Sequence, residues 1–168
     1  MMLLPQIETE RFILKCPDPK MDFSQYLTWM RDVDSYPYIE SANPKYTLAQ
    51  LQNYVNEVNS SSESIMLNIF TKVDKSHIEN IKFHDINPSL HSCWVGFLIG
   101  NKGWQRKGVA RESFLASSRV LSKDLSLTEF KLGVHSAHTE AINSYLKMGF
   151  RETNKSSQRI EMSFNIET

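Results

Sequence analysis

Apolar residues recur along this chain with two spacings, one typical of strands and the other of helices. Alternating or continuous apolar runs predict strands at residues 11–16, 65–71, 77–86, 92–100, 128–135, 150–153 and 159–164. Spacings of three and four residues predict helices at residues 22–31, after Thr47, at 107–121 and at 139–148. The expected order is strand, two helices, three strands, helix, strand, helix and two strands, which is an α/β (α+β) arrangement.

Sequence signals at single residues indicate where some of these elements begin, end or lie. Thr47 and Gln50 form a capping box at the start of the second helix. Gly149 follows the last helix, at a position where glycine commonly ends one. The run from Ser92 to Gly100 has no polar alternation, so we expect a central strand that is covered on both faces.

Composition narrows the class of protein. The chain has 168 residues, a size at which we expect one domain, residues 1–168, with a full core. Its formal net charge is zero, which disfavours a nucleic-acid binder with a broad basic face. Cys16 and Cys93 have neither metal-site spacing nor a disulfide pattern, so we expect no metal and a reduced, cytoplasmic setting. No run is long enough to span a membrane, and we expect no membrane partner.

Candidate chemistry is concentrated in the stretch from Trp94 to Glu112, WVGFLIGNKGWQRKGVARE. An apolar strand there leads through a basic, glycine-bearing turn into a helix, an arrangement that favours an anion site at the helix N-terminus. The dinucleotide pattern G-x-G-x-x-G is absent. Gly103 and Gly108 have the spacing of a nucleoside-triphosphate loop, but Val109 and Ala110 occupy the positions that require Lys and Ser or Thr.

Two separate motifs resemble those of one family. Gln105–Ala110, QRKGVA, is similar to Q/R-x-x-G-x-G/A, the pyrophosphate loop of the GNAT superfamily of acyl-CoA-dependent N-acetyltransferases. Ala141–Phe150, AINSYLKMGF, resembles the later motif N-x-x-A-I-x-x-Y-x-K-x-G-F of that family. Trp104–Glu112 and the early segment ETERFILK also resemble the branch that holds ribosomal-protein N-terminal acetyltransferases.

This resemblance, which extends from Ile7 along the whole chain, implies a fold and a reaction. The GNAT fold has a mixed, mostly antiparallel sheet of about seven strands with four helices. Its fourth and fifth strands, here the predicted strands 92–100 and 128–135, splay apart around the thioester of acetyl-CoA. The implied activity is transfer of an acetyl group from acetyl-CoA to a primary amine, by direct attack in a ternary complex. Whether the protein is a monomer or a homodimer stays open.

The resemblance also implies which residues bind the coenzyme. Backbone groups of the splayed strand would hold the pantetheine arm, and the turn and helix start would hold the pyrophosphate. His138 stands where the family has an asparagine that contacts pantetheine, and it either takes that role or only opens the last helix. The implied set is Phe97, Leu98, Ile99, Gln105, Arg106, Lys107, Gly108, Val109, Ala110, His138 and Asn143.

Acetyl transfer needs a neutral amine, donors for the oxyanion and a proton or hydrogen bond for the leaving thiolate. Tyr145 matches the family's tyrosine that points at the coenzyme sulfur, so it is the expected general acid. His84 and Glu112 are candidate bases, although Glu112 also suits the N-terminus of a helix. Further candidates for the base are Asp85, His135, Glu40 and a chain of water molecules.

The acceptor is the least determined part of the reaction. We expect its pocket to form from residues 36–46, 84–90 and 156–160, which are polar and aromatic without an acidic cluster, and this disfavours polyamines. The segment His77–Ile86 resembles the third strand of sugar-modifying relatives, and the preferred acceptor is a small-molecule amine or an amino sugar. The alternatives are a protein N-terminal amine, a non-catalytic acyl-CoA-binding module and a nucleotide-binding αβ protein.

Overall fold

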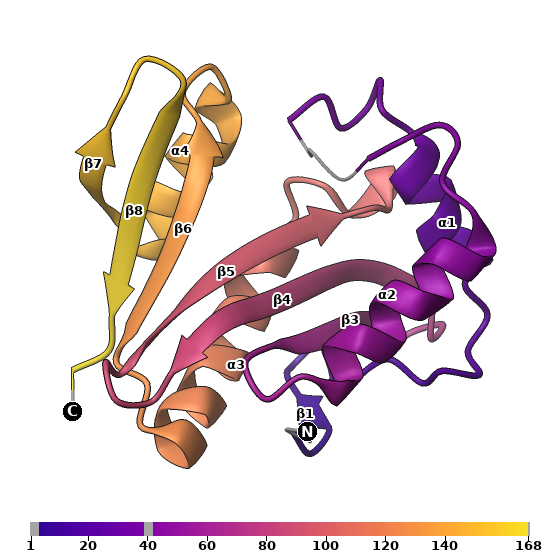
Figure 1. Cartoon of the computed structure of the whole chain (residues 1–168), viewed down its shortest axis with the longest axis horizontal. Helices are drawn as coiled ribbons and strands as arrows, with labels where there is room; N and C mark the ends of the chain where they lie inside the picture. The colour runs from indigo at the N-terminus through magenta and orange to yellow at the C-terminus, as the bar shows by residue number, and fades with distance from the viewer. Residues whose placement is uncertain (1–3, 39–41, 168) are drawn as a thin grey trace.

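In the part of the chain that the structure describes, eight strands form one sheet in the order β1-β2-β3-β4-β5-β6-β8-β7 (Figure 1). The structure, a computed structural model, describes residues 4–38 and 42–167, apart from the side chain of Ile99. The strands are β1 (Ile7–Glu8), β2 (Phe12–Lys15), β3 (Ile65–Thr71), β4 (His77–Asn87), β5 (Ser92–Ile99), β6 (Glu129–His135), β7 (Arg151–Lys155) and β8 (Arg159–Asn165). Seven of them match predicted strands, and β1 is additional because two residues are too few to show a period.

The helices begin and end close to the predicted positions. They are α1 (Ser24–Arg31), α2 (Leu48–Ser60), α3 (Val109–Leu125) and α4 (Thr139–Met148), with a short 3-10 turn at Lys102–Trp104. The capping box of Thr47 and Gln50 is present at α2, and Gly149 ends α4 with a positive φ of 112°. α3 begins at Val109 rather than at Lys107, because Gly108 has left-handed backbone angles and lies outside the helix as its N-cap.

The two faces of the sheet have different covers (Figure 1). α1 and α2 lie over one face of β3 and β4, while α3 and α4 lie behind the sheet in this view. Side chains alternate along β4, so Lys82 contacts Tyr54 of α2, whereas Phe83 packs toward Phe130 and α3. Glu79 shares the face of Phe83, and the functional groups of β4 are thereby divided between two sides of the sheet.

β5 and β6 separate along their length, as the sequence resemblance predicts (Figure 1). They run parallel, and their pairing is limited to Ser92 with Glu129, Cys93 with Phe130 and Trp94 with Lys131. Beyond Trp94, β5 stays paired with β4, whereas β6 stays paired with β8. Residues 95–99 therefore form an open edge of β5 that faces the gap.

The expectation that β5 is covered on both faces is wrong for its second half. Ser92, Cys93 and Val95 are buried, but Gly96 is exposed and Phe97 is only half-buried. Burial decreases where β5 leaves β6, because β5 has no strand partner among the described residues on its β6 side beyond Trp94. A continuous apolar run does not reveal such a departure, since it results from how distant strands pair.

Candidate functional site

The open edge of β5 presents unpaired backbone groups to the gap. Gly100 N–H donates to the carbonyl oxygen of Ile78, which places that pair in hydrogen-bonding register. Because antiparallel hydrogen bonds alternate, Leu98 bonds to β4, while the N–H and C=O groups of Phe97 and Ile99 point outward. Two of the three predicted pantetheine-binding residues thus face the gap with their backbone, and Leu98 does not.

The turn that follows β5 is tightly packed at its start. Tyr36 Oη donates to the carbonyl oxygen of Gly100 over 2.7 Å. A Cβ on Gly100 would lie 1.8 Å from Cδ2 of Trp29, so no larger residue fits. The Asn101 side chain accepts a hydrogen bond from Gly103 N–H and begins the 3-10 turn. These contacts anchor the loop before it reaches α3.

The N-terminus of α3 has the features of an anion site. Arg106 and Gly108 both have positive φ, 62° and 75°, which turns the backbone toward the helix start. Gly108 is the N-cap and gives no side-chain hydrogen bond, so the first-turn N–H groups have no side-chain acceptor. A Cβ on Gly108 would be in van der Waals contact with Nη2 of Arg11, 3.5 Å away, so the Arg11 guanidinium borders the N-terminus of α3. Val109 and Ala110 are buried, whereas Gln105 is exposed.

Basic side chains of the loop have partners from other elements. Arg106 makes an ion pair with Glu140 in the first turn of α4, with 2.6 Å between Nε and Oε1. Lys107 Nζ lies 5.4 Å from the centre of the Trp104 ring, and Arg11 donates to the Lys107 carbonyl oxygen. The loop is thus fastened to α4 and to β2, the two sides of the helix N-terminus.

Glu112 contacts the turn between β1 and β2. Its carboxylate accepts hydrogen bonds from Thr9 Oγ1, from the backbone N–H of Arg11 and from Arg11 Nε, over 2.7 to 3.0 Å. Burial acts to raise the pKa of Glu112, but the hydrogen bonds from Thr9 and Arg11 outweigh it, and the net pKa is lowered. A carboxylate with a low pKa and three donors is a weak base, and its geometry suits a structural contact between α3 and β2.

Tyr145 lies beside the open edge of β5. Its ring stacks on Phe97 with centroids 5.6 Å apart and an interplanar angle of 29°. Burial, together with the negative charge of Glu79, raises the pKa of Tyr145 to about 12. This raised pKa keeps the hydroxyl of Tyr145 protonated at neutral pH, so it can act as a hydrogen-bond donor.

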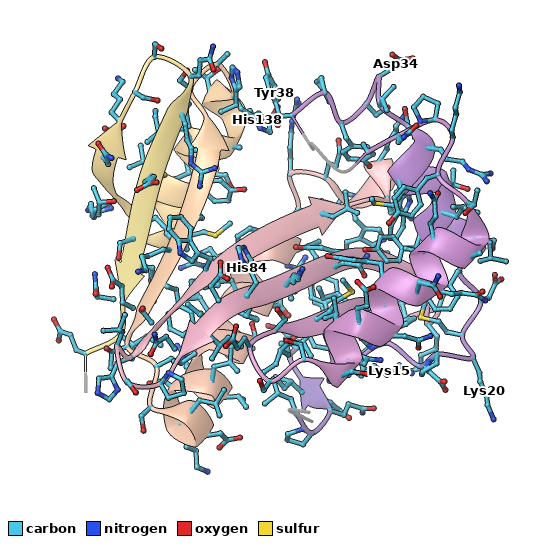
Figure 2. The ribbon with its side chains drawn as sticks, in the orientation of Figure 1. Lys15, Lys20, Asp34, Tyr38, His84 and His138 are labelled. Atoms are coloured by element: carbon cyan, nitrogen blue, oxygen red, sulfur yellow. The ribbon has the colours of Figure 1, made fainter. Side chains whose placement is uncertain are left out.

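His84 lies at the closed end of the gap. It pairs in register with Trp94, the last residue of β5 that pairs with β6, and Figure 2 shows it beside β5. Nδ1 of His84 is 2.9 Å from Oδ2 of the exposed Asp85. His84 shares the α2 face of β4 with Lys82, whereas Glu112 belongs to α3 on the opposite side. The structure does not bring these two candidate bases together.

At the other end of the gap, the loop after α1 reaches across to α4. Tyr38 stacks on His138 with ring centroids 4.6 Å apart, and it lies 4.9 Å from the ring of His135 (Figure 2). His138 is the N-cap of α4 but makes no side-chain cap hydrogen bond. Asn143 is exposed on α4, and Glu40 lies outside the described residues. The predicted residue His138 thus contacts the loop that borders the gap.

A cavity of about 280 Å³ opens on the α1 and α2 side of β5. Its location differs from the predicted acceptor segments 36–46, 84–90 and 156–160, of whose described residues only Tyr46 contributes to its lining. The other lining residues come from five elements, α1, α2, β3, β4 and β5, and no local sequence pattern joins them. The lining residues are Tyr26, Met30, Tyr46, Tyr54, Met66, Asn80, Lys82, Gly96, Phe97 and Leu98.

Sequence reasoning missed Glu79, the most unusual charged residue of this region. It is fully buried on β4, and both carboxylate oxygens are without a hydrogen-bond partner among the described residues. Burial raises the pKa of Glu79 to about 8. A signal for it exists, because Glu79 alternates with Ile81 and Phe83 and therefore shares their apolar face.

The match to a known family decides how this site is interpreted. A family model described as the acetyltransferase (GNAT) domain matches residues 11–151, most of the chain. The chain belongs to the GNAT acetyltransferase family. Membership makes it an N-acetyltransferase that uses acetyl-CoA, and the open edge of β5 corresponds to the expected splay of the GNAT sheet.

Solved structures support the GNAT fold of this domain. The GNAT-family acetyltransferase from Bacillus anthracis is 17% identical, with 96% of this chain and 98% of that chain covered and a TM-score of 0.80. A ribosomal L7/L12 alpha-N-protein acetyltransferase in complex with coenzyme A is 10% identical, with 96% and 98% covered and a TM-score of 0.84. Spermidine N-acetyltransferase from Vibrio cholerae, in complex with CoA and spermine, is 18% identical, with 94% and 96% covered and a TM-score of 0.78. No curated protein matches the chain.

No group of three or more His, Cys, Asp or Glu side chains among the described residues of this GNAT domain is placed to hold a metal ion. None of the described helices is long and apolar enough to cross a membrane.

Proposed function

We propose that this GNAT enzyme acetylates the primary amine of a small molecule or an amino sugar, by direct attack within a ternary complex. The proposal rests above all on the position of the 280 Å³ cavity, which meets the open edge of β5 at Phe97. Tyr145 stacks on that same Phe97 from the other side of the sheet. An amine in the cavity and a thioester beside Tyr145 would therefore be separated only by the edge of one strand.

The coenzyme would be held mainly by backbone groups. Gly108 and the first-turn N–H groups of α3 would bind the pyrophosphate, since the helix dipole favours an anion there and the N-cap residue has no side chain of its own. The outward N–H and C=O groups of Phe97 and Ile99 would bind the amides of the pantetheine arm. His138 and Asn143 on α4 would border that arm, and Arg106 would hold α4 near the loop through Glu140.

Acetyl-CoA supplies an activated acetyl group as a thioester. The amine nitrogen forms a bond to the acetyl carbon, the carbon–sulfur bond breaks, and the sulfur leaves as a thiolate. The Tyr145 hydroxyl, which its raised pKa keeps protonated, would donate a hydrogen bond or proton to that sulfur. The amine proton would pass to water or to His84 on the cavity side of β4. Glu112 would position α3 against β2 and take no proton.

Two observations disfavour the other acceptor classes. The cavity has a volume of about 280 Å³ and no carboxylate among the described residues lines it, so it offers little to bind a polyamine. Most of its walls are aromatic, methionine and leucine side chains, with Asn80 and Lys82 as polar groups, and such walls suit the faces of a small ring better than an extended peptide.

A turnover assay tests this proposal. Thiol release from acetyl-CoA is measured across small amines, amino sugars, spermidine and short peptides with free N-termini, and mass spectrometry identifies the acetylated product. We expect turnover with small amines or amino sugars. Turnover restricted to peptides would instead favour a protein N-terminal acetyltransferase, and coenzyme binding without any turnover would favour a non-catalytic module.

A further inference from the structure

We propose that the acceptor amine also carries an anionic group, a phosphate or a carboxylate, which Lys82 binds in the cavity beside β5. This inference rests on the proposed function and specifies its acceptor.

Of the described residues that line the cavity, Lys82 alone has a charged side chain. It pairs in register with Gly96 of β5, whose missing side chain leaves the space next to Lys82 open. A Cβ built on Gly96 would have no atom within 4 Å. The lysine therefore borders the part of the cavity that is nearest to the open edge of β5.

The Lys82 ammonium has a fixed place. Nζ donates to the hydroxyl of Tyr54 over 2.9 Å and lies 4.9 Å from the centre of the Tyr54 ring. The ring and the hydroxyl are both on α2, so the helix holds the cation against one wall of the cavity.

Among the described residues, no carboxylate lines the cavity and neutralises this cation. Glu79, the neighbouring glutamate on β4, points to the opposite face of the sheet and is buried there. Burial raises the pKa of Tyr46, and the charge of Glu57 on α2 adds a smaller increase. Glu57 is nevertheless exposed and does not line the cavity. An anion from the substrate is the missing partner for Lys82.

Other groups on the cavity wall are suited to the same anion. Asn80, which is 4% exposed, lines the cavity, and its Nδ2 has no hydrogen-bond partner among the described residues. Tyr26 and Tyr46 place further hydroxyls on the wall, and burial raises the pKa of both, so they remain protonated donors. A phosphate or carboxylate accepts several hydrogen bonds at once and fits this set better than a neutral group.

The positive charge also affects the reacting amine. A nearby cation favours the neutral form of an amine, which is the form that attacks the thioester. It repels a polyamine, whose remaining charges are all positive. A zwitterionic acceptor would place its anionic group at Lys82 and its amine at the open edge of β5.

The test compares matched acceptors with wild-type protein, Lys82→Met and Lys82→Arg. Glucosamine 6-phosphate is paired with glucosamine, and β-alanine with propylamine, so that each pair differs mainly in the anion. For the wild type, we expect kcat/KM for the anionic member of at least one pair to exceed that for the neutral member by about tenfold or more. Lys82→Met should abolish that preference while leaving acetyl-CoA affinity unchanged, and Lys82→Arg should keep most of it.

The outcomes separate this inference from the proposed function. A preference for phosphate, for carboxylate or for both that disappears in Lys82→Met supports the inference and identifies the anion. Equal turnover of charged and neutral members, or a preference that survives in Lys82→Met, overturns the inference and leaves the proposed function intact. No turnover of any small amine by the wild type overturns the proposed function and this inference with it.

Discussion

Glu79→Gln should change how the stability of the protein depends on pH. The carboxyl group of Glu79 is fully buried without a hydrogen-bond partner among the described residues, and burial raises its pKa from an ordinary 4.5 to about 8. Between these values the folded state keeps a proton that the unfolded state releases. Because the folded state then binds more protons, the free energy of unfolding falls as pH rises through this window.

The magnitude follows from the size of the shift. Each pH unit within the window corresponds to about 1.4 kcal/mol. The protonated Glu79 therefore contributes about 3 kcal/mol to stability at pH 5.5, relative to pH 8.5, where the contribution is nearly lost. Glutamine has the same shape and no proton to lose. The wild type should therefore lose about 3 kcal/mol more than Glu79→Gln between these two pH values.

Urea unfolding at pH 5.5 and 8.5 measures this difference, with Glu152→Gln on the exposed strand β7 as a control. The control should follow the wild type at both pH values. If the wild type and Glu79→Gln change in parallel with pH, Glu79 does not titrate in this window and the argument for a buried, unpartnered acid is refuted.

Three further variants test the site. Gly108→Asp should weaken acetyl-CoA binding on the order of 100-fold in calorimetry, because a carboxylate would face the pyrophosphate at the α3 N-terminus. The control Gly108→Ala measures the effect of the strained positive φ alone. Equal affinity in the wild type and Gly108→Asp would disprove the loop assignment. Tyr145→Phe keeps the stack on Phe97 but should lower kcat on the order of 10-fold to 100-fold with unchanged coenzyme affinity; an unchanged kcat would remove Tyr145 from the reaction. Gly100→Ala should destabilise the fold by about 2 kcal/mol, because the added methyl group overlaps Trp29. Gly96→Ala should leave stability unchanged, because the space around Gly96 is open. Equal stability of the two variants would contradict this packing argument.

The sequence predicts the local elements well because each has its own signal. Thr47 and Gln50 cap α2, Gly149 ends α4, and the apolar periods give nearly every strand. β1 has only two residues and therefore no period. The separation of β5 from β6 came from the resemblance of the motifs, since an apolar run alone favours a strand covered on both faces.

The glycine loop before α3 could be predicted because its residues are consecutive, whereas the cavity on the α1 and α2 side of β5 could not. The cavity joins Tyr26 of α1, Tyr54 of α2, Lys82 of β4 and Gly96 of β5, and only the packing of the sheet against two helices brings these together. Glu79 lies between these cases, because its place in the alternation of β4 predicts burial but not the absence of a partner.

Hydrogen–deuterium exchange at the open edge of β5 tests most directly how the enzyme holds acetyl-CoA. The outward amides of Phe97 and Ile99 have no strand partner on the side of the gap, so in the free protein they should exchange faster than the amide of Leu98. Saturating acetyl-CoA should slow exchange at Phe97 and Ile99, and within the first turn of α3. Saturation without added protection in residues 95–99 would contradict the assignment of the β5 edge as the coenzyme site.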